Sequence, residues 1–390
     1  MATGVVSATS DLVRKTWMRE GLLQAASKSF WAPYTGKTSD SIIHSVNNEN
    51  ASNGHTVTFD YSGNTVGKAI KNKDTAYGKG EQKKKFSESL TVERYRLVVD
   101  NGDKFDAVNI GDLSISEHVD SRNKLADQFI RFKDQALFDT AQGFYGNSAS
   151  THRILYDGSS TPMTYQTLVG IEEVLRTGRP FTSGTDLGYS IGTAPDTAAA
   201  ASTQRAPLAP FRLQDGRSIW LMVVDPYTAT QMKSGTGATT GLIAMSQQAD
   251  VRGNNNRVFK GILGQIGQLV IVEAEAFFGS SDGGTGLDAT SIEIAGMRQY
   301  DGTNWSGASG YTAATHSRNL ILGANAMQMA WGKQPDYKFQ ESQDFGIKSE
   351  SAVEFWMNSQ KVNLTAENSD YSMAKRASMD NGVVAFDVVL

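Results

Sequence analysis

The feature of this 390-residue chain that most limits its fold is one long helical pattern. In the segment "SISEHVDSRNKLADQFIRFKDQALFDTAQG", apolar residues recur at steps of three and four, and either Ser114 or Ser116 is predicted to cap its start. Gly143 is a typical residue for the end of such a helix. About 27 helical residues would span roughly 40 Å at 1.5 Å per residue. The pattern therefore predicts a rod around which the other elements are arranged.

The composition around this rod is that of a β-rich protein with many turns. The chain contains 38 glycines and no cysteine, so disulfides, thiolate ligands and a thiol nucleophile are all absent. Its formal net charge of −4 predicts no general attraction to nucleic acid or to an anionic membrane. No apolar run approaches the roughly 20 residues of a membrane helix, and no signal segment is visible at the N-terminus. We therefore expect a soluble protein without a membrane partner.

Two alternating segments, "TVTFDYS" and "SLTVERYRLVV", predict the strands of a long hairpin. Val57 and Phe59 are expected to share one face of the first strand. Between Lys68 and Lys85 the connection carries seven lysines against two acids, a net charge of +5. Such a run is usually a solvated loop. A nucleic-acid surface is the weaker interpretation, because it needs more aromatic platforms between the charges.

The first 50 residues or so are predicted to form an arm without a core of its own. Its aromatic residues include Trp17, Phe30, Trp31 and Tyr34, and each buried aromatic side chain removes roughly 150–250 Å² from water. They dock either on their own domain or on another subunit, and the residues alone do not decide between the two. The subunit alternative places Phe30, Trp31 and Tyr34 at the hairpin base or against a neighbour, so that Trp31→Ala would impair assembly more than folding.

The remaining elements follow from shorter patterns. The segment "TYQTLVGIEEVLRTG" predicts a helix, and "SIWLMVV" predicts a buried strand before Asp225-Pro226, which can open a helix. A further buried strand is expected within "QLVIVEAEAFF" and a closing strand in "GVVAFDVVL". The stretches 182–210 and 279–317 are predicted to be long loops.

No catalytic, cofactor or metal motif is complete. Gly36-Lys37-Thr38 matches the last three residues of the phosphate-binding loop motif, but Trp31 occupies the position of the first glycine of that motif. "GTGATTG" lacks the third glycine of a dinucleotide loop, and "DGGTGLD" lacks the alternating carboxylates of a calcium loop. The five histidines show no metal-ligand spacing. The sequence therefore predicts no enzyme, no cofactor and no metal site.

The order of these elements resembles that of the major capsid proteins of tailed double-stranded-DNA phages. Local matches to their N-four-like subgroup are "FWAPYTG", "SDSIIH", "TVTFD", "SLTVERYRLVV", "DQALFDTAQG", "RNLILGANAMQMAWGK" and "ESQDFGIKSESAVEF". The subgroup often carries an acidic stretch in the hairpin where this chain reads "AYGKGEQKKKF". The resemblance implies an α+β protein with the Hong Kong ninety-seven-like (Johnson) fold, built from an N-arm, an E-loop hairpin, a spine helix, a P-domain and an A-domain.

The resemblance also implies boundaries and partners. The expected divisions are 1–54 for the arm, 55–112 for the hairpin, 113–216 for the P-domain with the spine helix, 217–332 for the A-domain and 333–390 for C-terminal P-domain strands. Copies of the chain would form hexamers and pentamers of an icosahedral head, made and assembled in the host bacterial cytoplasm. The implied partners are the chain itself, a portal protein at one vertex, separate scaffolding and decoration proteins, and packaged double-stranded DNA by non-specific proximity.

The expected contacts between subunits combine the arm aromatics with the hairpin lysines. They are Trp17, Phe30, Trp31, Tyr34, Lys79, Lys83, Lys84 and Lys85. Asp336 to Asp387 carries nine acids against five bases, so we expect the basic hairpin tip to rest on this region of a neighbour. Two other classes stay open: an adhesin or tail-fibre module, which would form trimers or rods, and an enzyme.

Overall fold

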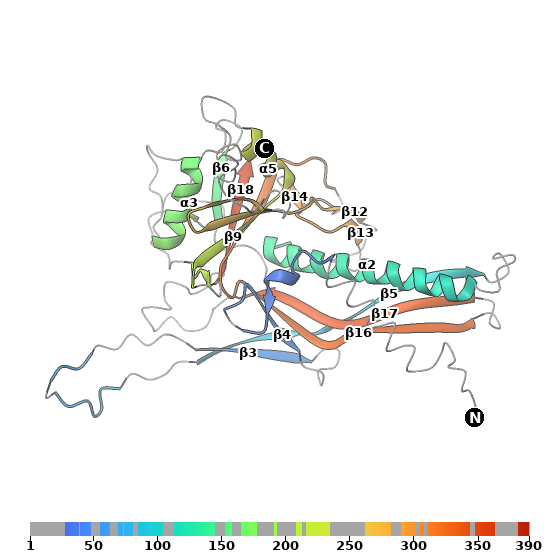
Figure 1. Ribbon diagram of the computed structural model, residues 1–390, viewed down its shortest axis with the longest axis horizontal. Helices are drawn as coiled ribbons and strands as arrows, with labels where there is room; N and C mark the ends of the chain where they lie inside the picture. Colours follow the sequence, from blue (N-terminus) through green and yellow to red (C-terminus); the bar gives the residue numbers. More distant parts are fainter. Residues whose placement is uncertain are drawn as a thin grey trace.

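The computed structural model describes these parts of the chain: 28–38, 40–47, 55–62, 69–72, 74–80, 85–103, 113–144, 153–157, 165–177, 191–192, 208–212, 216–234, 262–281, 290–301, 304–307, 310–343, 348–362 and 381–389. Within them the molecule is elongated, with two main sheets and a hairpin that projects from one end (Figure 1). A single long helix, α2 (Leu113–Gln142), runs along the body.

Five strands form the first sheet, in the order β1–β2–β16–β17–β5. Their bounds are Thr35–Gly36, Ile43–Asn47, Met327–Gln343, Lys348–Lys361 and Glu93–Asp103 respectively. Helix α2 lies along one face of this sheet (Figure 1). Tyr95, Leu97 and Val99 of β5 alternate toward that face and pack on the core, whereas Val98 between them is 53% exposed.

The second sheet has nine strands, seven of them in the order β10–β11–β9–β15–β18–β6–β7. Their bounds are Ile262–Ile266, Leu269–Glu273, Ser218–Val224, His316–Leu322, Val383–Val389, Arg153–Asp157 and Ile191–Gly192. Two short strands lie off this path: β8 (Phe211–Arg212) pairs with β9, and β14 (Gln299–Tyr300) pairs with β15.

Both faces of the second sheet are covered. Helices α3 (Tyr165–Thr177) and α5 (Pro226–Ser234) bury one face with the apolar cluster that includes Trp220, Met222 and Phe386. The other face joins the main core with α2 and the first sheet, through residues such as Leu221 and Leu320. The long helix is therefore shared between the two sheets.

Two antiparallel ribbons are separate from the two sheets in their strand pairing. The hairpin pairs β3 (Thr56–Ser62) with β4 (Lys85–Thr91), and a second ribbon pairs β12 (Phe278–Ser281) with β13 (Thr290–Ile294). A one-turn 3-10 helix, η1 (Ala32–Tyr34), carries the N-terminal aromatics.

Several predictions from local patterns are confirmed. The long helix exists and stops where Gly143 takes φ +82°, with the Gly143 N–H bonded to the Asp139 carbonyl at 3.0 Å. Asp225 caps α5, because its Oδ1 accepts from the Thr228 N–H at 2.8 Å. The predicted buried strands appear as β9 and β11. The predicted caps Ser114 and Ser116 are wrong, since the helix begins at Leu113 and contains both.

The two sheets group the strands differently from the expected domain divisions, and those divisions stay a prediction. Strand β18 does not lie with β16 and β17 but in the second sheet, between β15 and β6. Its residues Val383–Val388 are buried on both faces, as expected in the second sheet, which is covered on both. Strand β6 and helix α3, expected in the P-domain, belong with the second sheet as well. The stretch 279–317, expected to be a loop, contains β13, β14 and most of β12.

Candidate assembly surfaces

The base of the hairpin is fixed on its own subunit. Val57, Phe59, Leu90 and Val92 are buried together against Ala330 of the first sheet. The Tyr61 hydroxyl donates to Gln328 Oε1 at 2.6 Å, and the Gln328 amide donates to Glu88 at 3.1 Å. Desolvation, aided by the Glu88 charge, raises the pKa of Tyr61 well above its usual value, so the hydroxyl stays protonated and can donate. The face predicted for Val57 and Phe59 is thus the buried one.

The tip of the hairpin projects far from the body (Figure 1). Tyr77 is 94% exposed there, and Ile70 is 40% exposed. Lys79 and Lys85 are exposed too, while Lys83 and Lys84 lie outside the described residues. The hairpin tip has no core of its own and carries a solvent-exposed aromatic residue and a run of lysines. These features suit it to contact with another molecule.

The arm aromatics Phe30, Trp31 and Tyr34 pack on their own subunit. The Trp31 ring lies 4.9 Å from the Phe138 ring of α2 and 5.0 Å from Phe30, and the Trp31 side chain is 0% exposed. Phe30 and Tyr34 are half-buried against the same core. The expectation that Trp31 packs at the hairpin base or on a neighbour is therefore corrected, because a single chain already buries it. Trp17 lies outside the described residues.

A polar clamp holds the end of this arm on α2. Ser29 Oγ donates to Asp134 Oδ1 at 2.6 Å, the Phe30 N–H donates to Asp134 Oδ2 at 2.7 Å, and Lys133 Nζ donates to Ser29 Oγ at 2.9 Å. Burial raises the pKa of Asp134, and these donors oppose the rise. Sequence reasoning missed the clamp, because no local pattern connects residues about 105 positions apart.

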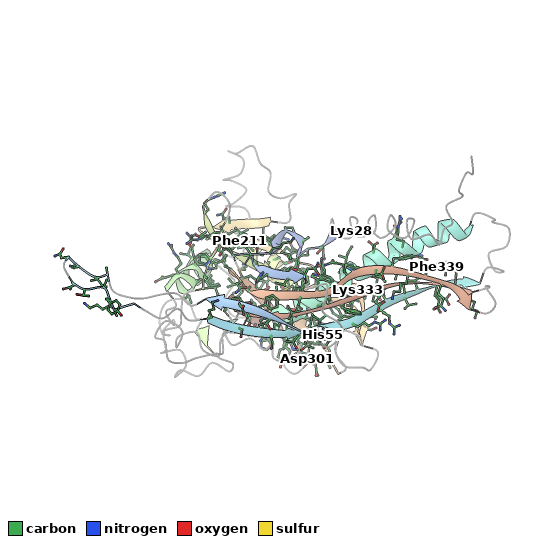
Figure 2. All side chains as sticks on the ribbon, turned by 90° about the horizontal axis from the view of Figure 1, so that it is seen from below. Lys28, His55, Phe211, Asp301, Lys333 and Phe339 are labelled. Atoms are coloured by element: carbon green, nitrogen blue, oxygen red, sulfur yellow. The ribbon has the colours of Figure 1, made fainter. Side chains whose placement is uncertain are left out.

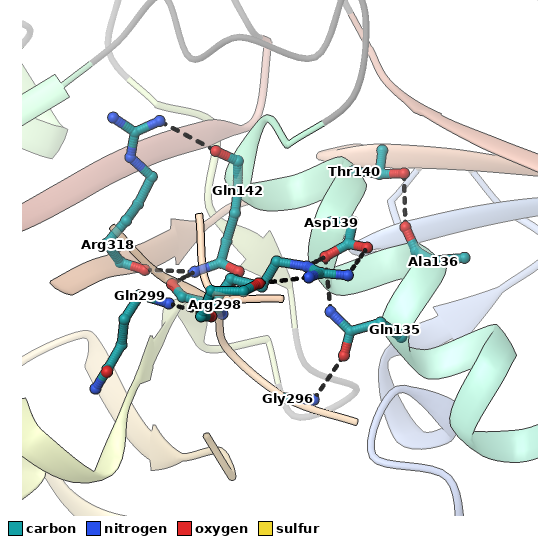
Figure 3. Close-up of polar contacts among 10 residues, drawn as sticks. Gln135, Ala136, Asp139, Thr140, Gln142, Gly296, Arg298, Gln299 and Arg318 are labelled. Carbon is teal, nitrogen blue, oxygen red and sulfur yellow. Dashed lines mark hydrogen bonds and ion pairs between the residues drawn. The ribbon is translucent and has the colours of Figure 1, made fainter. Parts of the chain in front are cut away.

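A buried ion pair joins the end of α2 to the segment before β14 (Figure 3). Arg298 Nε lies 2.6 Å from Asp139 Oδ1 and Arg298 Nη2 lies 3.1 Å from Asp139 Oδ2, with both side chains 0% exposed. The guanidinium also lies 4.1 Å from the Phe144 ring and 3.9 Å from the Phe277 ring. Gln135 donates to the Asp139 carboxylate at 2.6 Å.

The same helix makes a second set of bonds to this segment through Gln142 (Figure 3). Its amide donates to the Arg298 carbonyl at 3.0 Å and to the Arg318 carbonyl at 2.9 Å, and its Oε1 accepts from the Arg298 N–H at 2.8 Å. These contacts and the ion pair connect the spine helix with the second sheet. We call the residues Gln135, Asp139, Gln142 and Arg298 the helix–sheet joint.

The outer face of the first sheet, away from α2, carries a charge cluster around Glu354. Its side chain is 2% exposed, and its carboxylate pairs with Arg94, with Lys338 and, at 3.8 Å, with Lys333, which Figure 2 labels. Burial by itself would raise the pKa of Glu354, but the Lys338 hydrogen bond and the three cations outweigh it and lower the pKa.

This cluster bears on the predicted acidic landing surface for the hairpin tip. Four acids between Asp336 and Asp387 have described side chains: Asp336, Glu350, Glu354 and Asp387. Three of these four pair inside the subunit, Asp336 with Lys333 at 3.0 Å and Asp387 with Arg318 at 2.8 Å in addition to Glu354. In the described part of the region, little negative charge is thus left for a neighbour.

We expect Glu354→Gln to reduce the acid sensitivity of the subunit. A lowered pKa means that the carboxylate stabilises the fold above about pH 4.3, the ordinary Glu value, and that this stability is lost as the pH falls through the folded pKa. Because the partner cations are partly exposed, the loss at neutral pH is about 1 kcal/mol. Urea unfolding at pH 7 and pH 3 measures it. The control is Glu350→Gln on the same strand, and equal pH dependence of the Glu354→Gln variant and the unchanged protein would contradict the assignment.

The described residues bear on two of the motifs considered in the sequence, the metal cluster and the Gly36 turn. Within them no three His, Cys, Asp or Glu side chains come together as metal ligands. Gly36 lies in β1, and a Cβ there would meet Ser41 Oγ at 2.0 Å, so a close turn accounts for this glycine. Among the described helices, none has the length and apolarity to cross a membrane.

Comparison with known families decides the identity. The model of the phage capsid protein family matches residues 6–389, nearly the whole chain. The chain belongs to this family. It is a phage capsid protein, a structural subunit of the head. No curated protein matches the capsid protein in sequence.

Solved capsids share the fold of this capsid protein. Similar structures include the capsid of Ralstonia phage GP4 (20% identity, TM-score 0.56), that of Helicobacter pylori bacteriophage KHP30 (13%, 0.61) and the head of Helicobacter pylori bacteriophage KHP40 (14%, 0.62). Each match covers 93% of this chain and 91% of the other. The predicted α+β fold of the Hong Kong ninety-seven-like class is confirmed.

In this capsid protein the predicted contact residues separate into two described sets. Trp31 is committed to the subunit core, with Phe30 and Tyr34 beside it, whereas Lys79 and Lys85 are exposed on the hairpin. Sequence reasoning missed the exposed apolar pair Phe278 and Ile294 on the β12–β13 ribbon. The sequence did carry a signal for this exposed surface, because the stretch from Gly261 to Met297 contains acids and apolar residues but no Lys or Arg.

Proposed function

We propose that this capsid protein is the major subunit of an icosahedral phage head, assembling as hexamers and pentamers around the double-stranded DNA genome. The observation that carries the proposal is the hairpin, whose base is buried on its own subunit while its tip lies exposed far from the body. Head-to-tail contacts of this kind form rings when the rotation closes. Extended arms also supply the large areas that obligate interfaces bury.

The finer parts of the proposal rest on the family. We infer a portal protein at one vertex, separate scaffolding and decoration proteins, DNA held by non-specific proximity, and assembly in the host bacterial cytoplasm. The role is structural and involves no enzymatic step. The N-four-like subgroup stays a prediction from the local sequence matches.

Negative-stain electron microscopy and sedimentation velocity of the purified, concentrated protein test the proposal. We expect large closed particles. Trimers or elongated rods would instead support an adhesin or tail-fibre module, and a stable monomer at high concentration would contradict self-assembly.

A hairpin-shortened variant makes the test specific. Replacing residues 63–84 by Asn-Gly keeps β3 and β4 and closes them with a two-residue turn. Because the buried contacts of the hairpin base remain, the subunit should keep its circular dichroism spectrum and melting temperature, while particle formation is lost. Normal particles from this variant would exclude the hairpin as an assembly element.

A further inference from the structure

The β12–β13 ribbon presents an acidic and apolar surface that nothing in the described subunit covers. Phe278 and Ile294 are paired across the ribbon and are 59% and 45% exposed. Glu293 is exposed on β13 of the same ribbon, Glu275 is exposed in the segment just before β12, and neither side chain has an ion-pair partner among the described residues. We call these four residues the ribbon patch.

The ribbon patch lies within the most one-sided acidic stretch of the chain. From Gly261 to Met297 there are five acids and no Lys or Arg, a net charge of −5. Only Glu273 of the described acids is paired there, with Lys233 at 2.6 Å. By contrast, the region from Asp336 to Asp387 mixes nine acids with five bases, and its described acids are mostly paired.

The ribbon is also held in a defined position. Arg131 of α2 donates to the Ile292 carbonyl at 3.2 Å and to the Glu293 carbonyl at 3.0 Å. Ile292 packs on the main core below. A surface fixed to the spine helix in this way is preorganised for binding.

The hairpin tip has the complementary character. Tyr77 and Ile70 are its exposed apolar residues, Lys71 and Lys79 lie beside them in sequence and are exposed, and the run from Lys68 to Lys85 has a net charge of +5. Tip and ribbon lie well apart along the long axis of the molecule (Figure 1), so one chain cannot bring its own tip to its own ribbon.

We propose that the hairpin tip of one capsid protein docks on the ribbon patch of a neighbouring copy. Tyr77 and Ile70 contact Phe278 and Ile294, and Lys71 and Lys79 pair with Glu275 and Glu293. The contact is heterologous, so it can close into a ring, and its electrostatic part is weakened by salt. This proposal rests on the proposed shell function. It adds the surface that the tip binds, which is the ribbon patch instead of the region from Asp336 to Asp387 expected from the sequence.

Crosslinking tests the contact directly, because the natural chain has no cysteine. Tyr77→Cys and Phe278→Cys are combined in the full chain, assembled particles are treated with a short bismaleimide, and the products are separated on a denaturing gel. We expect covalent dimers and higher ladders. The control combines Tyr77→Cys with Val98→Cys. Val98 is 53% exposed, close to the 59% of Phe278, but lies on the outer face of the first sheet, so this variant should stay monomeric.

Two results would contradict the docking site while leaving the shell function intact. One is a ladder of crosslinked products from the Val98→Cys control; the other is the absence of crosslinked products from the Phe278→Cys variant in particles that do form. Absence of particles from the unchanged chain would contradict the shell function instead. The two failures are therefore distinguishable.

Charge reversal gives an independent readout if a cysteine variant fails to assemble. Lys71→Glu with Lys79→Glu, or Glu275→Lys with Glu293→Lys, should each lower particle yield about tenfold, because two attractive pairs become repulsive. All four substitutions together should restore the yield. Failure of the fourfold variant to recover, or normal yield from either double variant, would argue against the pairing.

Discussion

Replacing Trp31 by alanine is expected to lower the free energy of unfolding of the subunit by about 3–5 kcal/mol. The side chain is 0% exposed, and its ring packs on Phe138 of α2 and on Phe30 of the arm. Truncation leaves a cavity in the main core that such a packed site fills poorly. The variant should therefore fail in folding before it fails in assembly.

The measurement is guanidinium unfolding in the hairpin-shortened background, in which folding is observed without assembly. Trp31→Phe is the matched variant. It keeps an aromatic ring and removes the buried indole N–H, which has no hydrogen-bond partner within the described part of the chain, so its cost should be well below that of alanine. Tyr227→Ala, at an exposed position of α5, is the control for aromatic loss in the same background and should cost far less. An unfolding midpoint for Trp31→Ala equal to that of the parent would contradict the assignment.

Elements with a strong local period could be predicted from sequence. The α2 pattern, the alternation of β3 and the cap at Asp225 all depend on neighbours within a few residues. Local patterns do not show which strands pair. For this reason β18 was expected beside the other C-terminal strands, although it lies between β15 and β6. Its residues read as a closing strand next to β17, yet burial on both faces requires the doubly covered sheet.

The features of the candidate surfaces were likewise predictable only where they depend on the local sequence. The exposed lysines of the hairpin could be predicted because a long polar connection between two strands cannot form a core. The burial of Trp31 could not, because a tryptophan in an arm gives the same pattern whether it packs on its own helix or on a neighbour. Glu354 and Asp387 counted as available negative charge in the sequence, and only the structure shows that Arg94, Lys338 and Arg318 neutralise them.

Arg298→Met is expected to lower the free energy of unfolding by about 3–5 kcal/mol, because it leaves the Asp139 carboxylate buried without its cation. Asp139→Leu combined with Arg298→Met should recover much of this loss, since no buried charge then remains. Recovery is incomplete, because the Gln135 amide loses its acceptor and the Ser306 carbonyl loses the Arg298 donor. Lys233→Met, which removes the exposed pair with Glu273, is the control and should cost less than about 1 kcal/mol.

The pH dependence separates a buried charge from a simple loss of packing. Burial raises the pKa of Asp139, and Arg298 opposes that rise, so removing Arg298 raises the pKa further. An acid with a raised pKa binds its proton more readily in the folded state, so stability increases as the pH falls toward the unfolded pKa. The deficit of Arg298→Met relative to the parent should therefore be smaller at pH 5 than at pH 8 in urea unfolding. A deficit that does not change with pH would mean that the helix–sheet joint acts through the stacking of Arg298 on Phe144 and Phe277 rather than through its charge.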